Sequence, residues 1–137
     1  MLFRSTADEA TRAEIVEGLF ARVPASFVHG FDRPNLKLAM GPKVNARRQL
    51  LDFVEGHRGE SGIVYCSSRK QTEELAEHFT AQGFTALAYH AGLDNAERGR
   101  RQDQFLRDDG VVMTATIAFG MGIDKPDVRF EIGRAHV

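Results

Sequence analysis

Four short apolar runs alternate with segments of helical periodicity, and this alternation constrains the fold more than any other feature. The runs are GIVYC (62–66), TALAY (85–89), VVMTA (111–115) and VRF, which begins a strand at Val128. Short connections join each run to the helical segment beside it. A chain with this alternation forms a parallel sheet with helices on its faces. GIVYC is almost continuously apolar, which predicts a central strand.

Helix caps and breakers give the expected bounds of the other elements. Thr6 and Glu9 have the spacing of a capping box, which predicts a helix to about Arg22 with its apolar side chains on one face. SFVHG and LKLAM are expected strands on either side of a turn at FDRPN. Further helices are predicted over 45–57, over 67–82 ending at Gly83, and over 95–109 capped by Asp94.

Size and composition limit the classes of protein to consider. The 137 residues suit one domain or one lobe of a larger protein, and 42% hydrophobic residues suffice for a core. No secretory signal and no bilayer-length apolar run occurs, so we expect a soluble, cytoplasmic protein. The single cysteine, Cys66, excludes an internal disulfide and argues against a zinc site. The net charge of −1 means that any nucleic-acid site must be local.

Ligands of open parallel sheets bind at the carboxyl ends of the strands, where three loops contain unusual residues. In CSSRK (66–70), Ser68 and Gln71 form a good cap pair. In addition, the helix N–H groups, the hydroxyls and Arg69 could together hold a phosphate. The two interpretations are compatible if Ser68 caps the helix and Ser67 is free.

The second loop is YHAGL (89–93), in which His90 follows a buried strand and precedes a glycine. A histidine in this position is more often a structural hydrogen-bonding group than a ligand contact. The sequence leaves both roles open.

The third loop, TIAFGMGIDKPD (116–127), is long for a connection between a strand and the next element. Gly120 and Gly122 indicate positive φ angles or a close approach of a phosphate or sugar to the backbone. Asp124 could accept a hydrogen bond from a ribose hydroxyl, or it could serve as a turn residue. The composition of this loop favours a functional role.

A complete nucleotide site is not encoded in the chain. The sequence contains no GxxxxGK[ST] loop and no GxGxxG after a strand. ADEA (7–10) imitates an acidic helicase box, but it opens a helix and follows no apolar strand, so we reject it as a metal ligand set. The chain alone is therefore expected not to hydrolyse ATP.

The quoted stretches, the pattern Arg98/Gln102/Phe105 and the block ATIAFGMGIDKPDVRF resemble the second motor lobe of RecQ-family ATP-dependent DNA helicases. The resemblance runs from Thr6 to Phe130 without a gap, and Thr114 stands where the family more often has valine. The second lobe of DEAD-box RNA helicases shares the architecture but usually lacks FGMG. The resemblance implies an α/β fold, a three-layer RecA-like lobe with helices flanking a parallel sheet, truncated before its last strands.

The resemblance also implies a working mechanism. A first lobe in cis would supply the phosphate loop and the carboxylates for Mg²⁺, and ATP would bind between the lobes. Gly122 and Asp124 would face the nucleotide, whereas single-stranded DNA would meet Ser67, Ser68, Arg69, His90 and Thr116. The family usually moves 3′ to 5′ and acts on duplex junctions in DNA repair and recombination. We expect a nucleoid-associated cytoplasmic enzyme with no membrane partner and no zinc in this part.

The two ends of the chain invite a different interpretation. EIGRA resembles the start of an arginine-finger motif, but it follows Phe130 immediately and departs from that motif after Ala135. MLFRS and EIGRAHV can be back-translated to nearly complementary stretches that match a sequencing adaptor. We therefore expect 1–5 and 131–137 to be adaptor-derived, 6–34 to be the end of the first lobe with its linker, and 35–130 to be the incomplete second lobe. Arg134 would then be no catalytic arginine, although Glu131 and Ile132 could still prolong a strand.

An alternative of a different class is a non-catalytic α/β module that binds phosphorylated ligands or nucleic acid. Weak binding of single-stranded DNA by the chain would fit either interpretation. A phosphate loop and an acidic box in the sequence upstream would decide for the helicase.

Overall fold

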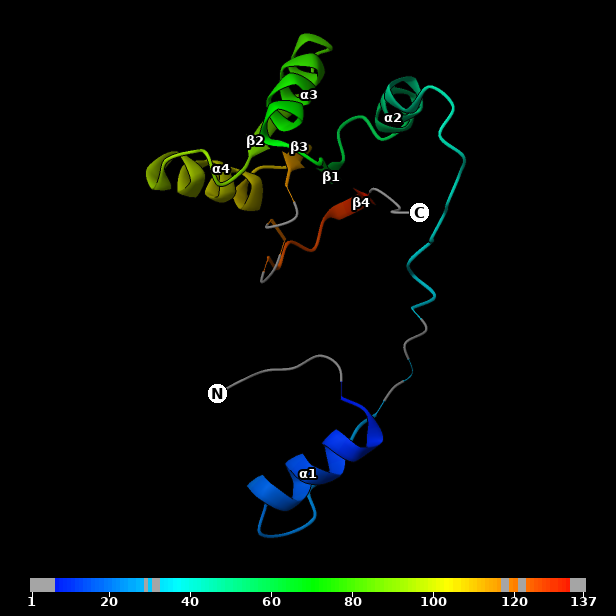
Figure 1. The fold of residues 1–137 in the computed structure, drawn as a ribbon, viewed down its shortest axis with the longest axis vertical. Coiled ribbons are helices and arrows are strands. Elements are labelled where there is room, and N and C mark those ends of the chain that lie inside the picture. The colour runs from blue at the N-terminus through cyan, green and yellow to red at the C-terminus, as the bar shows by residue number, and fades with distance from the viewer. Residues whose placement is uncertain (1–6, 29, 31–32, 117–118, 121–122, 134–137) are drawn as a thin grey trace. The chain divides into compact units, whose positions relative to one another are not determined.

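The computed structural model describes residues 7–28, 30, 33–116, 119–120 and 123–133. The chain divides into two compact units, Met1–Ala39 and Met40–Val137. Figure 1 labels the elements of both units. Gly122 and Arg134, two residues singled out in the sequence, lie outside the described residues, as does Thr6.

The first unit contains helix α1 (Glu9–Leu19), which begins later than its sequence predicts. Asp8 is the N-cap, and its carboxylate accepts a hydrogen bond from the Thr11 N–H at 2.8 Å. The predicted cap at Thr6 was therefore wrong, because an aspartate two residues later provides an equally good cap. The helix also ends before Arg22, and none of its residues is buried.

The two strands predicted at 26–30 and 36–40 were also wrong. Their described residues form no strand, and the side chains of Phe27 and Leu38 are 88% and 97% exposed. A strand requires a neighbour to satisfy its N–H and C=O groups, and the described part of this unit offers none. The turn between them is confirmed, since the Leu36 N–H donates to the Arg33 carbonyl at 2.8 Å.

The second unit is built on a four-stranded parallel sheet in the order β2-β3-β1-β4. The strands are β1 (Ser61–Tyr65), β2 (Thr85–Tyr89), β3 (Val111–Ala115) and β4 (Val128–Ile132). β1 pairs with β3 on one side and β4 on the other, as expected of the most apolar run. Glu131 and Ile132 do prolong β4, where they lie opposite Ile63 and Val64 of β1.

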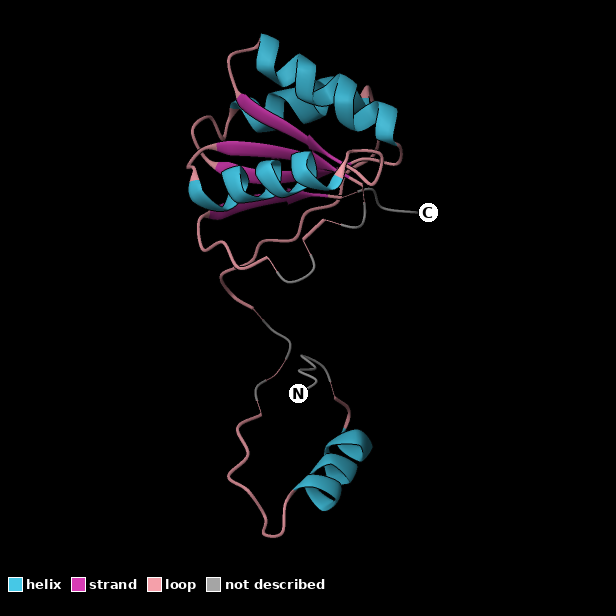
Figure 2. Ribbon diagram, turned by 90° about the vertical axis from the view of Figure 1, so that its left-hand side faces the viewer, coloured by secondary structure: helices cyan, strands magenta, loops and turns pink. Residues whose placement is uncertain are grey.

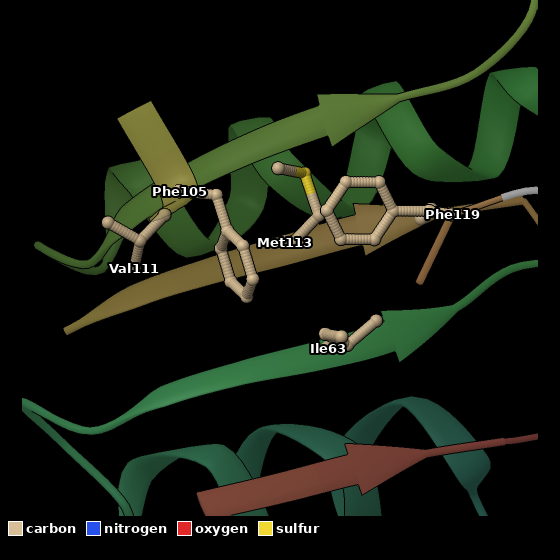
Figure 3. Close-up of a cluster of buried hydrophobic side chains, with 6 residues drawn as sticks. Ile63, Phe105, Val111, Met113 and Phe119 are labelled. Atoms are coloured by element: carbon tan, nitrogen blue, oxygen red, sulfur yellow. The ribbon is translucent and has the colours of Figure 1, made fainter. Parts of the chain in front are cut away.

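Helices cover both faces of this sheet, and the predicted three-layer α/β architecture is confirmed (Figure 2). The helices are α2 (Ala46–Glu55), α3 (Arg69–Ala81) and α4 (Asn95–Arg107). Val54 of α2 and Phe79 of α3 pack on one face with Val64, Val112 and Phe130. Figure 3 shows the opposite core, where Phe105 of α4 and Phe119 meet side chains of β1 and β3.

The predicted helix caps of the second unit agree with the structure, although α2 ends at Glu55 and α4 at Arg107, each two residues before its predicted end. Ser68 caps α3, Asp94 caps α4 through the Glu97 N–H at 2.8 Å, and Gly83 follows α3 with a φ angle of 84°. Thr114, the departure from valine, is fully buried, and its hydroxyl donates to the Thr72 carbonyl of α3 at 2.8 Å. Among the described residues, no helix has the length and apolar character that a membrane span requires.

Candidate functional site

The three loops singled out in the sequence begin side by side. Tyr65 at the end of β1 and Tyr89 at the end of β2 both lie opposite Ala115, the last residue of β3. The Cys66 N–H continues the ladder to the Ala115 carbonyl at 2.7 Å, and the Thr116 N–H donates to the Tyr89 carbonyl at 3.2 Å. We call this rim of the sheet the carboxyl edge. Sequence order separates the loops, and strand register brings them together.

The first loop presents the amino end of α3 at the carboxyl edge. The Ser68 hydroxyl accepts a hydrogen bond from the Gln71 N–H at 3.2 Å, as the cap prediction requires. Ser67 is not free, however, and that expectation was wrong. Its hydroxyl donates to the Gln71 amide oxygen at 2.7 Å, because the glutamine side chain turns back over the loop.

Besides Lys70, which pairs with Glu74 at 3.6 Å, this loop has one exposed cation, Arg69. Its side chain lies over Gly92 of the second loop, so a Cβ atom at Gly92 would stand 3.2 Å from the Arg69 Cδ and Nη1 atoms. Such contacts are tighter than nine in ten of those that real Cβ atoms make. Within the described parts of the chain, Arg69 forms no ion pair, so its charge remains available to a ligand.

His90 in the second loop is 7% exposed, and both its ring nitrogens are engaged. The Gly92 N–H donates to Nδ1 at 3.1 Å, which requires a lone pair on that atom. The ring hydrogen therefore sits on Nε2, which donates to the Glu73 carboxylate at 2.6 Å. This geometry matches the structural role that the sequence left open for His90.

The third loop starts at the same edge and is fixed there by Tyr65. The Tyr65 hydroxyl donates to the Phe119 carbonyl at 3.0 Å and lies at the same distance from the Glu131 carboxylate. Burial, followed by the bond to Glu131, raises the pKa of Tyr65 to about 12. Gly120 has a φ angle of 104°, and a Cβ atom there would stand 2.7 Å from the Tyr65 hydroxyl. A glycine is therefore required at this position.

The adjacent Asp124 and Lys125 have opposite environments. Lys125 is buried, and its ammonium group donates to the Asp108 carbonyl at 3.0 Å and the Asp127 carboxylate at 2.9 Å. Asp124 is exposed, and within the described residues it makes no hydrogen bond or ion pair. Within the described residues, no bond of Asp124 therefore supports the turn-residue interpretation.

A cavity of about 370 Å³ beside the first loop was not expected from the sequence. It lies between α2, α3 and the ends of β1 and β4, with Lys43, Arg47 and Ser67 among its polar lining residues. Cys66 also lines it, and burial raises the pKa of this thiol to about 11, so the thiolate is scarce at neutral pH. Lys43 and Arg47 carry no sequence signal, because isolated cations near a helix start are common.

The described residues contain no group of three or more His, Cys, Asp or Glu side chains that could hold a metal ion. Among the exposed carboxylates, Glu74 is paired with a cation of its own helix, Lys70. A divalent cation requires several oxygen ligands from one site.

Comparison with known proteins identifies the family of this lobe. Residues 43–133 match the model of the helicase conserved C-terminal domain, which covers the whole sheet and all three candidate loops. The ATP-dependent DNA helicase RecQ of Pasteurella multocida is 45% identical over 132 residues, which are 96% of this chain and 21% of that protein.

Two further relatives give the same result. RecQ of Haemophilus influenzae is 44% identical over 95% of this chain and 21% of its own length. The RecQ-like DNA helicase BLM of Xenopus laevis is 42% identical over 96% of this chain and 10% of its own length. This chain spans about a fifth of the length of the bacterial relatives. The fold, the matched residues and these relatives together show that the chain belongs to the helicase C-terminal domain family and is a RecQ-type lobe.

Proposed function

We propose that this chain is the second motor lobe of an ATP-dependent DNA helicase. The main observation in support of this proposal is that the amino end of α3, the 90–93 turn and Thr116 meet at the carboxyl edge of the sheet. This edge combines the N–H groups at the start of a helix with the cation Arg69, which forms no ion pair with a carboxylate among the residues that the structure describes. Such an arrangement suits phosphate groups.

Single-stranded DNA is the proposed ligand of this edge. Ser68, Arg69 and Thr116 would contact successive phosphates, and Ser67 could do so only by sharing or exchanging its bond to Gln71. Contacts to phosphates position a strand without reading its sequence. Binding at this edge is therefore expected to depend strongly on salt and little on base composition.

ATP is the proposed cofactor of the third loop. Asp124 is exposed and has no bond to a described residue, which suits a carboxylate that accepts a hydrogen bond from a nucleotide ribose. Gly122 would let the nucleotide approach the backbone, as expected from its residue type. Bound ATP would supply the free energy for movement along DNA. The carboxylates for Mg²⁺ would come from a first lobe in cis, since the described residues offer no metal cluster.

The finer functional assignments are also part of this proposal. Movement 3′ to 5′, action at duplex junctions in repair and recombination, and a nucleoid-associated cytoplasmic location follow the RecQ resemblance. The relatives named above are DNA helicases, which supports DNA over RNA and an enzyme over a non-catalytic module.

The decisive experiment uses the full-length protein that contains this lobe. We expect ATP hydrolysis that rises on addition of single-stranded DNA but not of RNA, and unwinding of duplexes with a 3′ tail. The 137-residue chain alone should show no DNA-stimulated turnover. Stimulation by RNA alone would favour a DEAD-box-type enzyme, and no turnover by the full-length protein would favour a binding module.

A further inference from the structure

One face of α3 holds the 90–93 turn at two points. Arg69 and Glu73 are four residues apart on this helix, so their side chains lie on the same face. Glu73 accepts the hydrogen bond from His90, and Arg69 lies over Gly92. The turn therefore rests on α3 through both side chains.

The bond between Glu73 and His90 fixes the geometry of the turn. With Nε2–H directed at Glu73, the Nδ1 lone pair faces inward and accepts from the Gly92 N–H. The Leu93 N–H then donates to the His90 carbonyl at 3.2 Å and closes the turn. Because His90 is 7% exposed, loss of its acceptor would leave a buried N–H group without a partner.

Gly92 transmits this geometry to Arg69. A Cβ atom at Gly92 would stand 3.0 Å from His90 Nδ1 and 3.2 Å from Arg69 Cδ. The Arg69 side chain thus lies against bare backbone at a place that His90 determines. A shift of the turn would remove this support and change the direction of the guanidinium group.

The carboxylate of Glu73 is bonded to His90 and not to Arg69. A Glu and an Arg four residues apart on a helix often form an ion pair. Within the described residues, the bond of the Glu73 carboxylate is to His90, and no ion pair joins it to Arg69. His90 therefore keeps the carboxylate one turn along α3 occupied while the Arg69 side chain stays exposed.

We propose that Glu73 is a positioning residue for the DNA contact of Arg69. Through His90 it holds the 90–93 turn in the place where Gly92 supports the arginine. This inference rests on the proposed function, since it requires Arg69 to bind a DNA phosphate. It assigns His90 an indirect role, in which its ring orders the edge and does not itself meet the strand.

The test measures binding of single-stranded DNA by the full-length protein and by Glu73→Ala at several salt concentrations. Removal of a carboxylate near a phosphate site would by itself strengthen binding. We expect the opposite, a fall in affinity of about five- to tenfold. The slope of the logarithm of the binding constant against the logarithm of the salt concentration should also become shallower by about 0.7, which is the contribution of one phosphate contact to a single strand. Glu73→Gln, which keeps an acceptor oxygen in the same place, should restore most of the affinity.

Glu77→Ala is the matched control, because it removes an exposed carboxylate one turn further along α3. It should bind DNA as the wild type does or slightly more tightly. Should Glu73→Ala fold poorly, Gly92→Ala tests the same contact with Glu73 intact, and it should weaken binding with the same loss of salt dependence.

A spectroscopic measurement separates this role from a general loss of stability. Long-range ¹H–¹⁵N correlation spectra of the full chain should show His90 as the Nε2–H tautomer in the wild type and in Glu73→Gln, but not in Glu73→Ala. The inference is overturned if wild-type protein binds DNA and Glu73→Ala binds it as Glu77→Ala does. Failure of the wild type itself to bind DNA would instead overturn the proposed function.

Discussion

Lys125 and Asp127 form an ion pair of 2.9 Å that fixes the far end of the glycine loop to the amino end of the sheet. Asp127 also accepts a hydrogen bond from Ser61, the first residue of β1, at 3.1 Å. The ammonium group of Lys125 lies 5.6 Å from the centre of the Phe105 ring in the core. The loop thus leaves the carboxyl edge beside Tyr65 and ends in a polar network at the opposite edge.

This network predicts a pH dependence of stability. The hydrogen bond from Lys125, with that from Ser61, lowers the pKa of Asp127 below its usual value of 3.8. A carboxyl group with a lowered pKa in the folded state stabilises the fold above pH 3.8, and this contribution is lost as the pH falls through the folded-state pKa. The thermal midpoint of Asp127→Asn should lie below that of the wild type at pH 7, and the gap should close as the pH falls below 3.8.

The exposed Asp103 of α4 provides the control, because Asp103→Asn should follow the wild type at every pH. A gap between Asp127→Asn and the wild type that stays constant down to pH 3 would contradict the role given to the ion pair. Lys125→Ala should lower the free energy of unfolding by about 2 kcal/mol, since it removes a buried charged hydrogen-bond donor. Urea denaturation measures this change.

Arg69→Ala and Asp124→Ala should affect different activities of the full-length enzyme. Arg69→Ala is expected to weaken binding of single-stranded DNA about tenfold and to flatten its salt dependence, because one charged phosphate contact is lost. Asp124→Ala should lower ATP turnover much more than DNA affinity, because its carboxylate is proposed to face the nucleotide. DNA titrations by fluorescence anisotropy and steady-state ATPase assays measure the two effects.

Arg107→Ala removes the same charge at the exposed carboxyl end of α4 and is the control for Arg69. Its effect on DNA affinity should be small. Equal losses of DNA binding and ATP turnover in Arg69→Ala and Asp124→Ala would argue against this division of roles.

Gly120→Ala should disturb the glycine loop without unfolding the sheet. The added methyl group would clash with the Tyr65 hydroxyl, and the φ angle of 104° is unfavourable for alanine. We expect a loss of ATP turnover in the full-length enzyme with a small change in thermal midpoint. Tyr65→Phe in the same protein should recover part of the activity, since it removes the clash but not the backbone strain. No recovery would show that the strain alone is responsible.

Thr114→Val should change the free energy of unfolding by less than about 1 kcal/mol. The variant loses the hydroxyl bond to the Thr72 carbonyl, but the valine methyl group fits a fully buried site. The carbonyl can keep its bond within α3, so no buried acceptor is left without a partner. Chemical denaturation of both proteins measures the difference, and a loss of several kcal/mol would mean that this bond is essential for the docking of α3.

The sequence alone determined the layered α/β fold and those features of the site that depend on neighbouring residues, such as the strand bounds and the helix caps. The apolar runs 85–89 and 111–115 predicted the bounds of β2 and β3 correctly. For β3 the reason is that a parallel strand buried on both faces must be apolar on both, whereas β2 is a partly exposed edge strand. Ser68, Asp94 and Gly83 predicted helix ends correctly, since caps depend on residues close in the sequence. The same local reasoning failed at 26–30 and 36–40, where β-type side chains had no described strand to pair with.

Only the tertiary structure decided how the candidate residues are used. The bond of Ser67 to Gln71 depends on a choice among rotamers that composition does not reveal. Besides their local partners, His90 and Lys125 each bond to a group 17 residues away, at Glu73 and at the Asp108 carbonyl. No local pattern predicts such pairs, because they form where the register of parallel strands and the docking of helices bring distant side chains within hydrogen-bonding distance.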